Sequence, residues 1–237
     1  MGRYNLVERS IGFYRKNGLQ KTFSRGWLSL RRMVWQSEMV LFYTLLGELS
    51  DIKNDQLYSF KIERIKREED IPDLAFRRLL NHWNETIMRR HIKERFGKGA
   101  VLWLAKLGKN YAGFGWSIIG TPIEPYFFPL TDTDIHFFNF HIFPEYRGRG
   151  INPLLVNHML LLLKQEGLER AFIETHAWNK AEIRSIEKTY FHKLGEVRKV
   201  TIFGKPIVYW SKISFQERAV GQKCPHSGGD NKINDSQ

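Results

Sequence analysis

The chain has 237 residues, of which 42% are hydrophobic and 14% aromatic, a composition typical of a globular protein with a sizeable core. Its single cysteine, Cys224, excludes a disulfide framework or a cysteine-based metal site within one chain and suits a reducing compartment. No apolar run reaches the ~18 residues of a membrane-spanning helix, and no signal peptide is recognisable, so we expect a cytoplasmic protein.

The net charge of +12 is concentrated at the N-terminal end, where residues 1–35 hold eight lysines and arginines against one glutamate. Apolar side chains recur there at helical spacing, which predicts two short basic helices in residues 1–36. Three roles stay open for them: docking on the rest of the chain, peripheral contact with an anionic membrane, and nucleic-acid binding. Nucleic acid is the least favoured, because the sequence contains no recognised RNA- or DNA-binding motif.

Residues 39–46 form the next apolar run, which fits either a buried strand or a short helix because periodicity cannot decide for so short a run. The polar stretch 50–56 marks the expected domain boundary. We therefore divide the chain into a basic N-terminal extension (1–54), a globular domain (55–213) and a polar tail (214–237). The tail is too hydrophilic to pack, so we expect it to be disordered.

Apolar spacing, glycines and prolines predict strands and helices that alternate along the domain, which indicates an α/β fold. In chain order we expect a strand at 57–65, helices at 71–83 and 86–96, strands at 100–106, 111–119 and 134–143, a helix at 152–167, a strand at 170–175, a helix at 180–193, and strands at 197–203 and 206–212. The loop 120–133, rich in proline and aromatic residues, fits either the lining of a ligand site or a packed surface loop.

The segment 134–167 combines a strand, a glycine-containing turn and a helix. We expect Asn152 to cap this helix and Pro153 to occupy its first position, where the missing N–H costs nothing. A helix that begins behind such a turn binds anions, because backbone N–H groups converge, the helix dipole adds positive potential and glycines allow close approach. Arg147 and Arg149 add positive charge to the turn.

This turn, Arg147 to Asn152, resembles the cofactor loop of the GNAT (Gcn5-related) N-acetyltransferases, which carry Gln/Arg-x-x-Gly-x-Gly/Ala there; Asn152 departs from the pattern. The element order over 57–212 is also similar to the GNAT fold, a mixed central sheet flanked by helices, here with an N-terminal helical extension. The resemblance implies acetyl-CoA as co-substrate, with its pyrophosphate on the loop residues Arg147, Gly148, Arg149, Gly150, Ile151 and Asn152. It also implies that a backbone N–H near Ile142 or Phe143 polarises the thioester carbonyl.

A second stretch, 176–197, resembles the family around its fifth strand and following helix. The matching residues are Asn179, Ile183, Arg184, Ser185, Glu187, Lys188, Phe191 and Gly195. The resemblance implies that Asn179 contacts the pantetheine arm of the cofactor, although a helix N-cap explains this residue equally well. Ile186 stands where many members have a tyrosine that protonates the leaving thiolate. Tyr190 is our candidate for this acid if the helix end bends inward, and otherwise a structural residue.

Glu174 is our candidate for the base that removes the amine proton. It lies five residues before Asn179, where some protein-N-terminus acetyltransferases of this family place a basic carboxylate, and the apolar run around it disfavours the charged form. A surface strand residue is the alternative. His176 shares a strand face with Glu174, and Asn139 and His141 are candidates to hold a water chain. Structural hydrogen bonding remains the alternative for these histidines, and with His136 they show no metal-ligand spacing.

The sequence therefore predicts an acetyl-CoA-dependent N-acetyltransferase that acts on an amine, such as an amino sugar or another small amine. It needs no metal. The alternative is a non-catalytic acyl-CoA-binding or scaffold protein with a membrane- or RNA-contacting basic arm, in which Asn152 and Ile186 mark lost catalysis.

Overall fold

The computed structural model describes residues 38–50, 60–82, 85–120, 122, 126–202 and 205–213. The strands are β1 (Glu38–Leu45), β2 (Phe60–Ile65), β3 (Val101–Leu107), β4 (Asn110–Ile119), β5 (Asp134–Ile142), β6 (Arg170–His176), β7 (His192–Ile202) and β8 (Lys205–Ile213). The helices are α2 (Asp73–His82), α3 (Glu85–Gly97), α4 (Ile151–Gln165) and α5 (Lys180–Ile186), with short 3-10 turns η1 (Leu46–Glu48), η2 (Glu68–Asp70) and η3 (Pro144–Tyr146). The expected helices of 1–36 and the disordered tail 214–237 lie outside the described residues.

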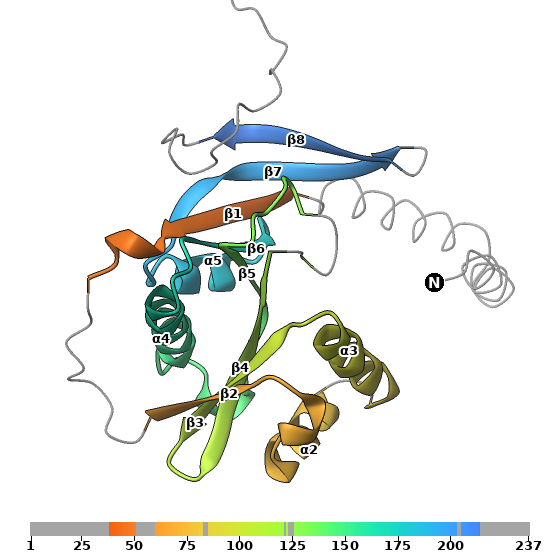
Figure 1. Cartoon of the computed structure of the whole chain (residues 1–237), viewed down its shortest axis with the longest axis vertical. Coiled ribbons are helices and arrows are strands. Elements are labelled where there is room, and N and C mark those ends of the chain that lie inside the picture. The colour runs from red at the N-terminus through yellow and green to blue at the C-terminus, as the bar shows by residue number, and fades with distance from the viewer. Residues whose placement is uncertain are drawn as a thin grey trace, which may run out of the picture.

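All eight strands join one mixed sheet in the order β2-β3-β4-β5-β6-β1-β7-β8. Only the central pair β5–β6 is parallel, and every other described neighbour is antiparallel. The predicted α/β class and mixed central sheet are confirmed. Figure 1 shows β3 and β4 running obliquely to β1, β7 and β8, so the sheet twists between its two halves.

The apolar run 39–46 is a strand rather than a helix. As β1 it pairs with β6 on one side and β7 on the other, and Val40, Leu41 and Phe42 are buried. The boundary expected after residue 54 had assigned this strand to the extension, whereas its pairing makes it an interior strand of the sheet. An interior strand is covered on both faces, so it reads as a continuous apolar run without alternation.

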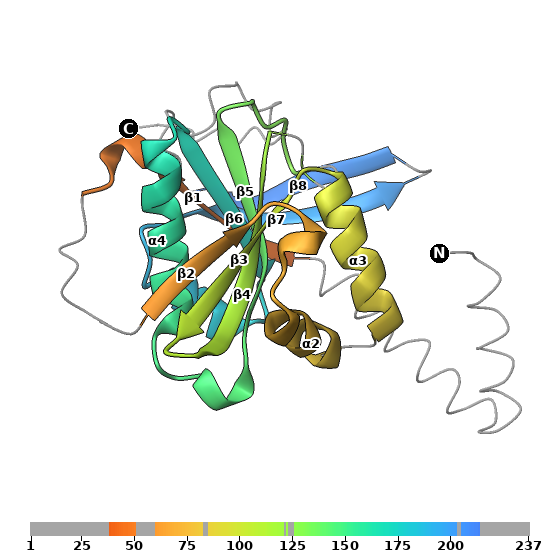
Figure 2. The same cartoon turned by 60° about the horizontal axis from the view of Figure 1, so that its bottom comes forward.

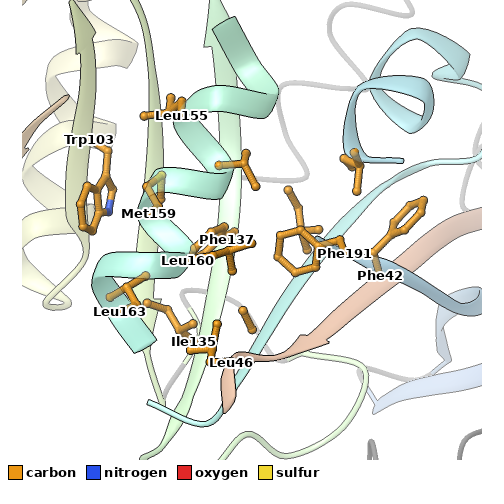
Figure 3. Close-up of a cluster of buried hydrophobic side chains, with 14 of the residues drawn as sticks. Phe42, Leu46, Trp103, Ile135, Phe137, Leu155, Met159, Leu160, Leu163 and Phe191 are labelled. Carbon is orange, nitrogen blue, oxygen red and sulfur yellow. The ribbon is translucent and has the colours of Figure 1, made fainter. Parts of the chain in front are cut away.

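The two faces of the sheet are covered by different helices, with α4 on one face and α2 and α3 on the other (Figure 2). Side chains of α4 pack against the inner strands, as Leu155, Met159, Leu160 and Leu163 do around Phe137 (Figure 3). On the other face, α2 and α3 pack over β3 and β4. This layering leaves the carboxyl ends of β5 and β6 between the two helical layers.

Two predicted helix boundaries were wrong. Helix α4 begins at Ile151, and its N-cap is Gly150 with no side-chain cap, so Asn152 and Pro153 lie inside the first turn instead of at its start. Helix α5 ends at Ile186 instead of continuing to residue 193, because the chain turns there and enters β7. Phe191, in that turn, is buried with its ring 5.7 Å from the ring of Phe137.

Candidate active site

The parallel pair β5–β6 separates before its strands end. Its pairing stops at Phe137 and Ile173, after which β5 continues beside β4 and β6 continues beside β1. A bulge in β5 marks this point, where Asn139 has a positive φ of 54°. The rings of Phe137 and Phe140 both pack on the α4 side, 6.0 Å apart, so the intervening residues both face the α3 side.

Of the two predicted backbone donors, Ile142 is turned toward the side from which β6 has separated. The N–H of Phe143 donates to the Ala112 carbonyl of β4 at 2.9 Å. In an antiparallel ladder, the N–H and C=O of the preceding residue then point away from that neighbour. The Ile142 carbonyl indeed accepts from Arg147 Nε at 3.0 Å, outside the ladder. The N–H of Phe143 is used in the hydrogen bond to β4, so it is not the donor. The Phe143 ring is buried beneath the Arg78 guanidinium.

The glycine loop leads from this donor to the start of α4. Gly148 and Gly150 have φ values of 76° and 71°, a region that side chains rarely adopt, and no described atom lies within 4 Å of the position a Cβ would take at either. Helix α4 has no side-chain cap, so no side chain accepts hydrogen bonds from the N–H groups of its first turn. Pro153, which lies in this turn, has no N–H. With Arg147 and Arg149 exposed beside them, this arrangement fits a diphosphate.

Asn152, the departure from the family pattern, points its amide toward α5. Its Nδ2 donates to Ser185 Oγ at 2.9 Å, while its Oδ1 is buried without a hydrogen-bond partner among the described residues. The extra bulk of asparagine relative to glycine or alanine is therefore held between two helices. The loop residues 147–150 remain exposed.

Glu174 lies on the α3 side of β6 and forms an ion-pair contact with His136 of β5. The His136 Nε2 atom lies 3.1 and 2.9 Å from the two carboxylate oxygens, and the side chains are only 9% and 17% exposed. Tyr126 covers this pair, with its ring 4.8 Å from that of His136. Burial, together with the Glu174 carboxylate, raises the pKa of the Tyr126 hydroxyl well above its usual value, so this hydroxyl keeps its proton. Glu174 thus belongs to a half-buried polar cluster rather than to an open surface.

Residues 66–190, more than half of the chain, match the model of the acetyltransferase (GNAT) family. The chain belongs to the GNAT acetyltransferase family. No curated protein sequence matches it.

Solved structures resemble the chain at low identity. A GNAT acetyltransferase from Colwellia psychrerythraea is 13% identical over 75% of this chain and 56% of that one, with a TM-score of 0.49. A functionally unknown conserved protein from Staphylococcus epidermidis is 12% identical over 70% of this chain and 63% of that one, with a TM-score of 0.46. The chain therefore spans less than two thirds of either structure.

The GNAT asparagine of the second motif, Asn179, acts as the N-cap of α5. Its Oδ1 accepts from the Glu182 N–H at 3.3 Å, and its Nδ2 donates to the Glu182 carboxylate at 2.6 Å, so the two side chains hold the cap in place. The Thr175 hydroxyl also donates to this carboxylate at 2.6 Å. Burial raises the pKa of the Glu182 carboxyl, and this effect outweighs the hydrogen bonds from Thr175 and Asn179, which lower it. The cap is what the structure shows for Asn179, while its contact with pantetheine stays a prediction.

Of the other candidates from the sequence, His176 lies two residues along β6 from Glu174 on the same face, as expected, because the strand continues to His176. The Tyr190 hydroxyl lies 3.5 Å from the Ser50 carbonyl, and Ser50 follows η1, which bonds to Glu169 at the opposite end of β6. His176 stacks on Trp178 with ring centroids 5.3 Å apart. His141 packs 5.7 Å from the ring of Phe114 on the α3 side.

The sequence indicated His136 only as one of three histidines, and Tyr126 only as one of the aromatic residues of the loop 120–133. The parallel register of β5 and β6 brings His136 to Glu174: His136 pairs with Phe172, which lies two residues before Glu174 on the same face. The signal for Tyr126 was the aromatic loop 120–133.

Proposed function

We propose that this GNAT protein transfers the acetyl group of acetyl-CoA to an amine. The observation that carries the proposal is the Ile142 N–H, which faces the separation of β5 and β6 beside an uncapped helix start with two exposed arginines. A phosphate-binding helix start and a backbone donor at one end of a parallel strand pair are the two elements that acyl transfer from a diphosphate-bearing thioester requires.

Each residue of the site has a role under this proposal. The thioester of acetyl-CoA supplies the activated acyl group. The first turn of α4, with Arg147 and Arg149, binds the diphosphate, and the Ile142 N–H donates to the thioester carbonyl oxygen. Glu174 accepts the proton of the substrate ammonium, which is needed because an aliphatic amine of pKa ~10 is almost wholly protonated at neutral pH. His136 holds the Glu174 carboxylate toward β5.

Acetyl transfer is tested directly by incubating the full chain with acetyl-CoA and a mixed panel of amino sugars, amino acids and polyamines. Release of free CoA thiol that depends on one of these amines supports the proposal, and mass spectrometry of the acetylated product identifies the acceptor. Binding of acetyl-CoA without amine-dependent thiol release favours the non-catalytic alternative. One observation favours that alternative: Ile186, which stands where many family members have the acidic tyrosine, is buried in the α4 core and has no proton to donate.

We expect the substitution Gly150→Glu to weaken acetyl-CoA binding severely, because it places a carboxylate at the helix start that binds the diphosphate and blocks backbone approach. The matched control is Gly167→Glu, at the other end of α4, where φ is 83° and the space around the Cβ position is also open. Calorimetry measures the dissociation constant of each variant, and thermal melting shows whether backbone strain is equal. Equal binding by folded Gly150→Glu and wild type contradicts the assignment of the loop.

The basic extension carries a separate prediction, since residues 1–36 lie outside the described part of the chain. Their positive charge and aromatic residues lead us to propose peripheral contact with an anionic membrane. None of the described helices is long and apolar enough to span a membrane. We expect the full chain to co-sediment with anionic vesicles less strongly at high salt, and a chain lacking residues 1–36 to stay in solution. Equal behaviour of both forms favours docking of the extension on the domain.

A further inference from the structure

Arg95, in the last turn of α3, points its guanidinium at the bulge of β5. With the Asn139 amide oriented to satisfy both groups, Asn139 Oδ1 accepts from the two terminal guanidinium nitrogens at 2.6 and 2.7 Å. The guanidinium lies over two aromatic rings, 5.0 Å from the centroid of Trp116 and 5.6 Å from that of Phe138. Burial lowers the pKa of Arg95 to about 10, so the half-buried group still carries its charge at neutral pH.

Among the described residues the charge of Arg95 is affected by the neighbouring Glu94, but no carboxylate lies within ion-pair distance of its guanidinium. Within the described part of the chain no carboxylate forms an ion pair with Arg95, whereas five other arginines have one: Arg64, Arg67, Arg78, Arg89 and Arg170. The Trp116 ring beneath it adds an indole N–H, a donor only, which is buried without a partner among the described atoms. The guanidinium has a neutral amide oxygen but no carboxylate to compensate its burial, and the indole N–H beneath it has no acceptor among the described atoms, so an anionic acceptor bound here would be stabilised.

The bulge places this group between the two residues of β5 that the proposed function uses. Asn139 is exposed and lies on β5 between His136, the partner of Glu174, and Ile142, the proposed donor to the thioester. Three residues along a strand span roughly 10 Å. An amine that reaches Glu174 and the thioester thus has Arg95 within the length of a small molecule, on the α3 side of the sheet.

We propose that Arg95 and Asn139 bind a carboxylate carried by the acceptor, so that the substrate is an amine with a carboxylate roughly 7–10 Å away, the length of two or three extended residues. Arg95 donates to the carboxylate, for which its planar fork of N–H groups is suited, and the Asn139 amide turns its NH₂ group toward it. The proposal rests on the acetyl transfer proposed above and narrows its acceptor class.

The test uses glycine oligomers of one to four residues as acceptors, each as the free acid and as the C-terminal amide. For wild type we expect kcat/KM to be at least about tenfold higher for the acid than for the amide at two or three residues. In Arg95→Gln this preference should disappear through loss of rate on the acid, with the amide rate nearly unchanged. Arg95→Lys should restore part of it. Arg90→Gln, which removes an exposed arginine from the same helix, is the matched control and should keep the wild-type ratio.

Direct binding keeps the two proposals separate. Calorimetry with the N-acetylated acids and amides reports the carboxylate site without any turnover, and calorimetry with acetyl-CoA reports the cofactor loop. Equal binding of acid and amide to wild type, or an acid preference that survives in folded Arg95→Gln, overturns the carboxylate site while leaving acetyl transfer intact. Absence of acetyl-CoA binding overturns the proposed function instead. A loss of thermal stability in Arg95→Gln with an unchanged acid-to-amide ratio assigns Arg95 a purely structural role and also overturns the site.

Discussion

Replacing Glu174 by glutamine should lower the rate of acetyl transfer at neutral pH on the order of a hundredfold or more, the usual effect of losing a general base. Glutamine keeps the shape of the side chain and can still accept a hydrogen bond from His136 Nε2. In the wild-type chain this nitrogen lies about equally close to the two carboxylate oxygens of Glu174. Binding of acetyl-CoA should be unchanged, because the glycine loop and α4 do not contact Glu174. The Glu174→Gln variant therefore tests the basicity of the side chain separately from its packing.

The pH dependence of the Glu174→Gln defect is the decisive measurement. As the pH rises toward the pKa of the amine, ~10, an increasing share of the acceptor is already neutral, so the variant should approach wild type. A packing defect would not be rescued by alkali. Rates of both proteins on one acceptor should be compared across pH, with Glu187→Gln, at the exposed C-cap of α5, as a control for loss of a carboxylate. A variant as fast as wild type at neutral pH removes Glu174 from the mechanism.

The sequence predicted the fold because its strands and helices are signalled locally. Alternation in β2 and the glycine turn between β3 and β4 identify these elements from neighbouring residues alone. The placement of β1 could not be predicted in this way. Its apolar run fits a strand or a helix, and only pairing with β6 and β7, more than a hundred residues away, decides between them. Tertiary context overrides local periodicity for such short buried runs.

The residues of the candidate site also differ in whether neighbouring sequence alone indicates them. The glycine loop was recognised because its chemistry is contiguous, from Arg147 to Asn152. The partnership of Glu174 with His136 was not predicted, because it depends on the register of two parallel strands joined by α4. The N-cap of α4 was misplaced by two residues because asparagine is a strong N-cap, whereas glycine at a positive φ takes this place here. Asn152 instead donates a hydrogen bond to Ser185, a contact that no local sequence pattern indicates.

The closed end of the strand pair is held by a buried ion pair that no sequence pattern indicated. Asp134 begins β5 and is 0% exposed, and Arg170 begins β6 opposite it in the register. Arg170 donates to both carboxylate oxygens, Nε at 2.6 Å and a terminal nitrogen at 2.7 Å, and the Thr131 N–H adds a third bond to this carboxylate at 2.7 Å. The pair therefore fixes the register from which β5 and β6 later separate.

Replacing Asp134 by alanine should lower the free energy of unfolding by about 3–5 kcal/mol, because it leaves Arg170, with a side chain only 16% exposed, without the carboxylate that compensates its burial. The matched control is Asp70→Ala, which breaks the exposed ion pair with Arg67 and should change the stability little. Urea unfolding followed by circular dichroism measures both variants against wild type. A loss in Asp134→Ala no larger than in Asp70→Ala would show that the buried pair does not stabilise the fold. A large loss in Asp134→Ala, with acetyl-CoA binding retained while folded, is the expected result, since the glycine loop proposed to bind acetyl-CoA follows the other end of β5.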